Sequence, residues 1–381
     1  GNVTSTNSTG NGITVTGSSG NVDFFGKTKV ENATGTAIDI QNNPGKVGFA
    51  DVDLDSDGQT ALFVRNSGEV IIESGDITAI NSGAAVDIED APVEIVLNSV
   101  SADGGAFGIR LVDTPGRFVI FGNGSNTAGS GGLIQNMTTA GVVAENAGVV
   151  ALQYVDLDGN NIGLQATDTY RVVLQSSRVT DSTTFGTDLV DVENLEIVGS
   201  IFTGNGDSSV RARFQTVDDY EYDIRSSLFT QATGHAVDLV TEAGAAGSNL
   251  ELVVTRSEFN TAGTGASGVN VAWNGGLSTT ITRNEFNGTG GSNTGVAIDV
   301  LSTTKTASIG MAANVFEFTG GADTAISITT AGKSSILLES NAVLFDDPGG
   351  IGAAGGTGFN FDLASQASVS LLNNLIIDND S

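Results

Sequence analysis

The sequence has no cysteine, only one histidine and only four prolines among 381 residues. The absence of cysteine excludes disulfides, thiolate zinc sites and cysteine nucleophiles. Collagen needs glycine at every third position and abundant proline, so four prolines exclude a collagen helix. With one histidine and no strand–GxGxxG–helix context, serine-triad, P-loop and dinucleotide-binding motifs have no support.

Basic residues are also scarce, since 15 Lys and Arg stand against 44 Asp and Glu, for a net charge of −29. Nucleic-acid binding needs a basic face that displaces counterions from phosphate, so we expect no nucleic-acid partner. No run of about 18 apolar residues occurs, and we expect no membrane insertion by this segment. The first ten residues lack the basic and apolar regions of a secretion signal. Strong acidity favours solubility in salty or extracellular surroundings.

What is abundant is glycine, with 52 residues, and an apolar fraction of 39% that is too high for a disordered chain. A short motif recurs in which apolar residues alternate around a polar one, as in GTAIDI at 35–40 and GAAVDI at 83–88. It returns as GHAVDL at 234–239 and GVAIDV at 295–300. Alternation of period two predicts short β-strands.

The motif recurs at intervals of about 22 to 33 residues in equivalent positions, which indicates a fixed core with loops of variable length. Ile38, Leu62, Val86 and Ile109 follow one another at 24, 24 and 23 residues. A second column has the form Asn or Ser, any residue, then a large apolar residue. We predict that it forms a structural ladder of polar residues, namely Ser200, Ser227, Ser257, Asn284, Asn314 and Asn341, beside the aromatic residues Phe202, Phe229, Phe259, Phe286 and Phe316.

These columns predict an all-β fold, a right-handed single-stranded parallel β-helix, or solenoid, of about 13 turns with three short strands per turn. Each strand would pair in parallel with its copy about 4.8 Å along, so that like residues stack upon like. A β-sandwich also uses short strands, but it does not explain why like residues recur at one phase. Both ends interrupt the repeat pattern, so we expect residues 1–381 to form a single β-helix domain that is a section of a longer protein.

On these motifs the chain resembles the right-handed parallel β-helix of the pectin-lyase-like superfamily over nearly its whole length. Its G-x-A-I and N/S-x-F motifs are similar to those of large bacterial surface repeat proteins, including polymorphic outer-membrane proteins and autotransporter passenger domains. The resemblance implies a cell-surface location, and its enzyme members imply polysaccharide lyase or hydrolase activity as an alternative.

The residues do not provide a recognisable lyase or hydrolase set, and we therefore expect no catalytic residues. Glycoside hydrolysis needs two carboxylates at a set separation, for which the sequence offers the adjacent pairs Asp218–Asp219 and Asp346–Asp347. The NTD, GHG and RIK motifs of polygalacturonase-type enzymes are missing. His235 replaces Thr, Ala or Val of other copies, which favours a turn residue. Arg211 and Arg213 alternate along one strand and are interpreted as a salt-bridged surface patch.

Calcium is the one cofactor that the sequence suggests. ADVDLDSDG at 50–58 places carboxylates on alternate residues, and hard oxygen ligands at this density suit Ca²⁺. Asp53, Asp55 and Asp57 would take the first positions of an EF-hand loop, but position twelve is Val64 where that loop has Glu. The competing interpretation is a strand with Val52 and Leu54 inward and the aspartates outward.

These observations lead us to expect a non-catalytic structural or adhesive module (an adhesin) at the cell surface. It would be a rigid β-helical rod that spaces, displays or assembles end to end into an extracellular filament or layer. Its partners would be other copies of itself, flanking domains of the same chain, or surface glycans. The alternative is a carbohydrate-active or glycan-binding β-helix. That alternative needs aromatic side chains that stack against sugar rings, and the chain has only one Trp and four Tyr.

Overall fold

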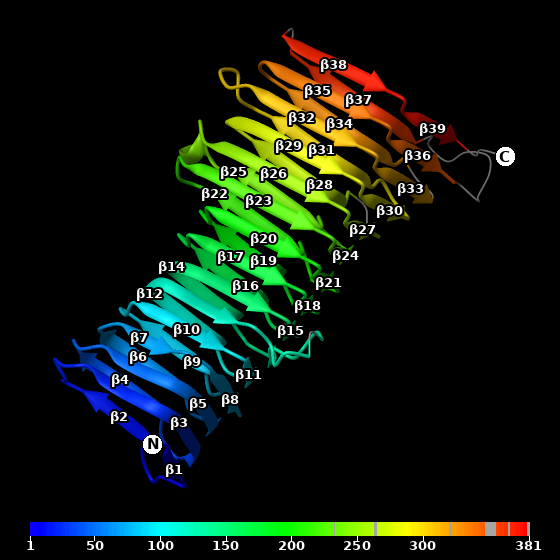
Figure 1. Cartoon of the computed structure of the whole chain (residues 1–381). Helices are drawn as coiled ribbons and strands as arrows, with labels where there is room; N and C mark the ends of the chain where they lie inside the picture. Colours follow the sequence, from blue (N-terminus) through cyan, green and yellow to red (C-terminus); the bar gives the residue numbers. More distant parts are fainter. Residues whose placement is uncertain are drawn as a thin grey trace. The chain divides into compact units, whose positions relative to one another are not determined.

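A computed structural model describes residues 1–125, 127–231, 233–262, 265–319, 322–346, 356–364 and 366–378. They form an all-β parallel β-solenoid of about 12 turns with almost no helix, which matches a single-stranded parallel β-helix (Figure 1). The predicted fold class is confirmed. The estimate of about 13 turns was too high, because some turns carry long loops; Ala102 pairs with Ile134, a step of 32 residues.

The chain divides into two compact units, Gly1–Thr183 and Thr184–Ser381. The strands of the first unit are β1 (Val3–Thr6), β2 (Ile13–Thr16), β3 (Val22–Ala33), β4 (Ile38–Asn43), β5 (Val47–Asp57), β6 (Leu62–Ser67), β7 (Val70–Ile72), β8 (Gly75–Ile80), β9 (Val86–Glu89), β10 (Val93–Leu97), β11 (Ser99–Asp103), β12 (Phe107–Ile120), β13 (Leu133–Gln135), β14 (Ala140–Gln153), β15 (Asp156–Asp158), β16 (Ile162–Thr167), β17 (Arg171–Gln175) and β18 (Arg178–Thr180).

The second unit adds one short 3-10 helix, η1 (Ala243–Ala245). Its strands are β19 (Phe185–Val190), β20 (Asn194–Val198), β21 (Ile201–Thr203), β22 (Val210–Phe214), β23 (Asp219–Arg225), β24 (Leu228–Gln231), β25 (Val237–Thr241), β26 (Asn249–Thr255), β27 (Glu258–Thr261), β28 (Ser267–Trp273), β29 (Gly276–Thr282), β30 (Glu285–Thr289), β31 (Thr294–Val300), β32 (Ala307–Ala312), β33 (Val315–Thr319), β34 (Thr324–Thr330), β35 (Ser334–Glu339), β36 (Ala342–Phe345), β37 (Thr357–Leu363), β38 (Ala367–Leu372) and β39 (Leu375–Asp378).

Three strands per turn recur through the second unit, and each pairs in parallel with its counterpart in the next turn (Figure 1). One face contains β25, β28, β31, β34 and β37, the second contains β26, β29, β32, β35 and β38, and the third contains β27, β30, β33, β36 and β39. In the first unit some strands are longer and pass through a corner. The long β5, for example, pairs with β7 near its start and with β8 further along.

The apolar column of the repeated motif lies in the interior of the coil. Ile38 pairs with Leu62, Leu62 with Val86, and Val86 with Ile109, and all four side chains are completely buried. Because each side chain rests on its copy one turn away, the period-two pattern of one strand repeats through the stack. Burying each such side chain contributes about 1.5–3 kcal/mol.

Sharp corners between the faces are made by residues in the left-handed conformation. Positive φ angles occur at 21 non-glycine residues of the described chain, most of them Asn or Asp, which adopt this conformation at lower cost than other side chains. In the second unit such a residue directly precedes the third face of each turn, as at Ser226 (φ 51°), Arg256 (φ 53°) and Ser340 (φ 55°). The corners therefore recur in phase with the strands, and they orient the polar ladder that follows.

Candidate functional site

The predicted ladder residues lie one above another at a corner inside the second unit. Each turn donates its backbone N–H to the side-chain oxygen of the next turn. Ser227 Oγ accepts from Ser200 at 3.1 Å, and Ser257 Oγ accepts from Ser227 at 3.2 Å. Asn284 Oδ1 then accepts from Ser257 at 2.9 Å. The ladder satisfies backbone groups that burial would otherwise leave without partners.

The asparagine part of the ladder adds side-chain bonds to the backbone bonds. Asn284 Nδ2 donates to Asn314 Oδ1 at 3.0 Å, and Asn314 Nδ2 donates to Asn341 Oδ1 at 2.9 Å. The series continues one turn beyond the predicted set, because Asn341 donates to Asn374 Oδ1. Asn284, Asn314 and Asn341 are buried, so this arrangement stabilises the coil and offers nothing to a ligand.

The phenylalanine column forms a continuous stack beside that ladder. Phe229, Phe259, Phe286 and Phe316 are almost parallel, with ring centroids 4.8–5.0 Å apart, and Phe202 stacks on Phe229 at 5.0 Å. The glycine of the repeated motif makes room for it. A Cβ on Gly295 would lie 2.5 Å from the Phe316 ring, so only glycine fits above the ring. The glycine of the repeated motif and the phenylalanine column are thus parts of one packing arrangement.

The aspartates of the calcium hypothesis lie along β5, with Val52 and Leu54 buried between them. Asp53 Oδ2 lies 2.8 Å from Lys27 Nζ, and this hydrogen bond raises the pKa of Lys27. Asp57 accepts a hydrogen bond from Asn81 at 2.7 Å. Partial burial, followed by the neighbouring carboxylates Asp53 and Glu31, raises the pKa of Asp55.

This geometry does not fit a calcium cage. The Cα atoms of alternate residues in one strand are about 7 Å apart, and here Asp53 is directed to Lys27 while Asp57 is directed to Asn81. Within the described ranges, no group of three or more His, Cys, Asp or Glu residues could hold a metal ion. Asp53, Asp55 and Asp57 therefore do not converge on a single ion, and calcium binding stays a hypothesis for measurement.

The arginines singled out by the sequence are engaged in ion pairs on the outer surface. Arg211 Nε lies 3.1 Å from Asp188 Oδ1, and Arg213 lies 3.4 Å from the same carboxylate. Arg211 also stacks over the Phe185 ring at 3.9 Å. Because both guanidinium groups share one nearly buried aspartate, they are not free to neutralise the carboxylate of a substrate.

The histidine and the aspartate pairs also have structural partners. His235 lies in the turn before β25, where its Nδ1 accepts a hydrogen bond from the backbone of Ser267 at 3.1 Å. Asp219 accepts from Asn249 at 2.7 Å, and Asp218 Oδ1 accepts from the backbone of Asp219. In the pair Asp346–Asp347, Asp347 lies outside the described residues.

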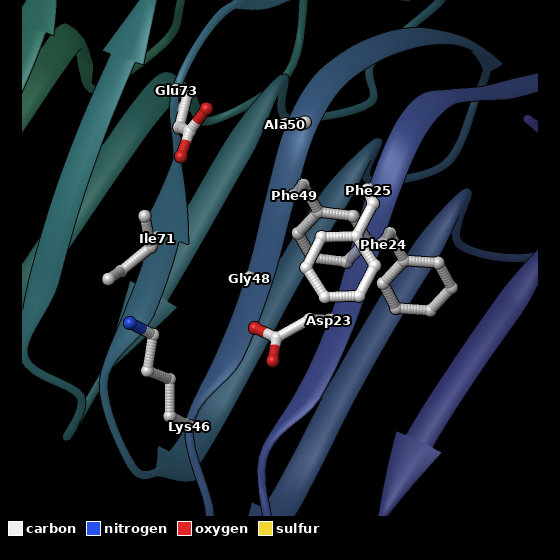
Figure 2. Close-up of a pocket in the computed structure, with 9 residues that line it drawn as sticks. All are labelled: Asp23, Phe24, Phe25, Lys46, Gly48, Phe49, Ala50, Ile71 and Glu73. Carbon is white, nitrogen blue, oxygen red and sulfur yellow. The ribbon is translucent and has the colours of Figure 1, made fainter. Parts of the chain in front are cut away.

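A candidate ligand site is a hollow on the outer surface of the first unit, near its N-terminal strands (Figure 2). Its volume is about 330 Å³, part of which is open to solvent. Apolar walls come from three phenylalanines with Ala50 and Ile71, and charged groups stand around them. The lining residues are Asp23, Phe24, Phe25, Lys46, Gly48, Phe49, Ala50, Ile71 and Glu73.

Sequence reasoning missed this hollow, although one signal was present. Phe24 and Phe25 are adjacent, and in a strand of period two only one of them can point inward. Phe24 stacks on buried Phe49 with centroids 4.7 Å apart, while Phe25 is 84% exposed. An adjacent aromatic pair in an otherwise alternating strand therefore indicates an outward aromatic side chain.

A scan against protein-family models finds no match to this chain, and a search of the curated proteins finds no similar protein. In the part of the chain that the structure describes, no helix has the length and apolar character needed to cross a membrane.

Proposed function

We propose that this chain is a non-catalytic structural or adhesive module of the cell surface. It is a rigid β-helical element that spaces, displays or assembles end to end into an extracellular filament or layer. Its three-faced parallel coil, with internal asparagine and phenylalanine columns, also supports kinship with the pectin-lyase-like superfamily and with the repeat proteins of bacterial surfaces. The strong acidity and the lack of cysteine are compatible with an extracellular location.

The observation that carries this proposal is the uncovered apolar surface of the last described turn. Leu371 stacks on Leu338, and Ile376 stacks on Val343. Leu338 and Val343 are completely buried, whereas Leu371 is 50% and Ile376 is 49% exposed. Side chains that continue interior columns are thus left in contact with water.

One further parallel turn would bury these residues and would pair the free strand edges of β37, β38 and β39. Exposed strand edges of this kind are templates for pairing with another chain, and apolar burial contributes about 25 cal/mol per Å². In the proposed assembly, a second copy of this protein supplies that turn by pairing its own strands with these edges.

A carbohydrate-active enzyme is the alternative function. Lyases that act on uronic acids need cationic groups to neutralise the substrate carboxylate, and here Arg211 and Arg213 are bound to Asp188. Most other outward charges that the sequence suggested for chemistry have partners of their own. This pairing favours the structural module over the enzyme.

The test is to measure the assembly state of the wild type and of Leu371→Asp by light scattering and negative-stain electron microscopy. We expect concentration-dependent oligomers or ordered polymers for the wild type, and at least a tenfold weaker association for Leu371→Asp. Ile80→Asp is the matched control, because Ile80 is 44% exposed on the side of the coil and lies outside the last turn. A dispersed wild-type monomer that cleaves polysaccharides would overturn the proposal.

A further inference from the structure

The exposed phenylalanine of the hollow is held outward by an irregularity in strand pairing. Phe24 pairs with Phe49 and Lys27 pairs with Asp51, so that Phe25 and Gly26 together oppose Ala50. This is a β-bulge, a feature that redirects a side chain and is common next to functional sites. The backbone N–H of Lys27, just beyond it, donates to Asn2 Oδ1 at 3.1 Å, which attaches the first residues beside the bulge.

The floor of the hollow depends on a residue without a side chain. Gly48 lies between Asp23 and Ile71 in the register of β3, β5 and β7. A Cβ on Gly48 would lie 2.7 Å from Asp23 Oδ1, so the carboxylate of Asp23 leans over the glycine. Figure 2 shows this carboxylate between the phenylalanine rings and Ile71.

The charges around the hollow are mixed in sign and uncommitted. Asp23, Glu73 and half-buried Lys46 form no ion pair with any described residue, in contrast to Lys27 and Lys29 nearby. Two carboxylates accept hydrogen bonds, and the ammonium of Lys46 donates them. An anionic ligand would be repelled by the two carboxylates, on a protein whose net charge is −29. A cationic ligand would be repelled by the ammonium group of Lys46.

We propose that this hollow binds a neutral saccharide ring of a surface or extracellular glycan. Such a ring has an apolar C–H face that packs against the ring of Phe25, and hydroxyl edges that bond to Asp23, Lys46 and Glu73. Ligand sites combine apolar walls with a few placed polar groups in this way, and this hollow is shallow and partly open to solvent. The site goes beyond the structural role proposed above and does not depend on it.

The experiment measures binding of the full 381-residue chain to neutral oligosaccharides by ligand-observed NMR. The probes are cellotetraose, xylotetraose and maltotetraose, with tetragalacturonate as an anionic probe and tetramethylammonium as a cationic one. We expect at least one neutral probe to bind with a dissociation constant of about 1 mM, as is typical of a small open site. Phe25→Ala is expected to weaken that binding about tenfold.

Gly48→Ala is a second, independent variant, because its methyl group displaces the carboxylate of Asp23 and fills the floor. Phe121→Ala is the matched control, since Phe121 is 45% exposed and lies outside the hollow. Circular dichroism confirms that each variant is folded. The proposal is overturned if no neutral probe binds, if a charged probe binds more tightly, or if Phe121→Ala weakens binding as much as Phe25→Ala. Assembly measured by light scattering is unaffected by either result, so the two proposals fail separately.

Discussion

At the scale of single residues, a neighbouring turn can supply the hydrogen-bond partner of a buried polar group. Asp323 is 1% exposed and accepts a hydrogen bond from the backbone N–H of Asn293 at 2.6 Å. Burial raises the pKa of Asp323, and the hydrogen bonds from Asn293 only partly oppose this. Ionising the Asp323 carboxyl group therefore costs more free energy in the folded chain than in the unfolded chain.

This cost predicts a pH dependence of stability with a definite sign. Between the unfolded pKa of about 3.9 and the raised folded pKa, the folded state holds more protons than the unfolded state, so stability falls as pH rises. We expect Asp323→Asn to increase the free energy of unfolding at pH 7, because the amide removes the buried charge that raises the pKa of Asp323.

The measurement is urea unfolding of both proteins at pH 7 and at pH 3. The gain from Asp323→Asn is expected to disappear at pH 3, where the wild-type carboxyl is protonated in both states. A gain of equal size at the two pH values would contradict a role for the charge.

At the scale of structural elements, successive turns are joined by side-chain ladders as well as by strand pairing. Asn314 is the clearest link, because its Oδ1 accepts two hydrogen bonds from Asn284 and its Nδ2 donates to Asn341 and to the carbonyl of Ile281. Leaving such buried partners unsatisfied costs about 1–3 kcal/mol for each group. The ladder is therefore a mechanical connection between β30, β33 and β36.

Two substitutions at Asn314 separate hydrogen bonding from packing. We expect Asn314→Ala to lower the free energy of unfolding by about 3 kcal/mol, and Asn314→Ser by about 1 kcal/mol. Serine is the milder change because Ser227 already occupies an equivalent place, accepting from Ser200 and donating to Arg225 O at 2.9 Å. Thermal and urea unfolding measure both effects, and equal losses for the two variants would show that the ladder bonds contribute little.

At the scale of the whole molecule, the excess of 44 acidic over 15 basic residues dominates the electrostatics. Exposed ion pairs contribute about 0–1 kcal/mol each, and most carboxylates have no cation to pair with. Net repulsion between carboxylates is screened by salt over a distance of about 3 Å at 1 M. We therefore expect salt to stabilise this chain more by screening repulsion than it destabilises it by weakening ion pairs.

We expect the melting temperature to rise by about 5 °C between 10 mM and 1 M NaCl, which corresponds to about 1–2 kcal/mol for units of this size. A fall in melting temperature would show that ion pairs such as Arg65–Asp87 outweigh the repulsion.

The same thermal unfolding experiment tests whether calcium binds. If Asp53, Asp55 and Asp57 hold Ca²⁺, then CaCl₂ stabilises the protein more than NaCl at equal ionic strength, and Asp55→Asn removes the difference.

The parallel coil, its interior columns and the polar ladder were predictable from the sequence, because each of these features repeats. A residue such as Val86 pairs with its copies Leu62 and Ile109 in the two adjacent turns. The spacing between copies in the sequence therefore predicts which interior residues are neighbours. The number of turns was less predictable, since loop length changes the interval without changing the columns.

Only the tertiary structure decided which outward charges are paired and where a ligand could bind. Lys27 reaches Asp53 from a neighbouring turn, and the bulge at Phe25 and Gly26 follows from a local shift in pairing between β3 and β5. Neither feature repeats from turn to turn, so the repeat pattern of the sequence does not predict it. Interior packing is specified by a pattern common to every turn, whereas the surface is specified by single residues whose neighbours depend on the exact register.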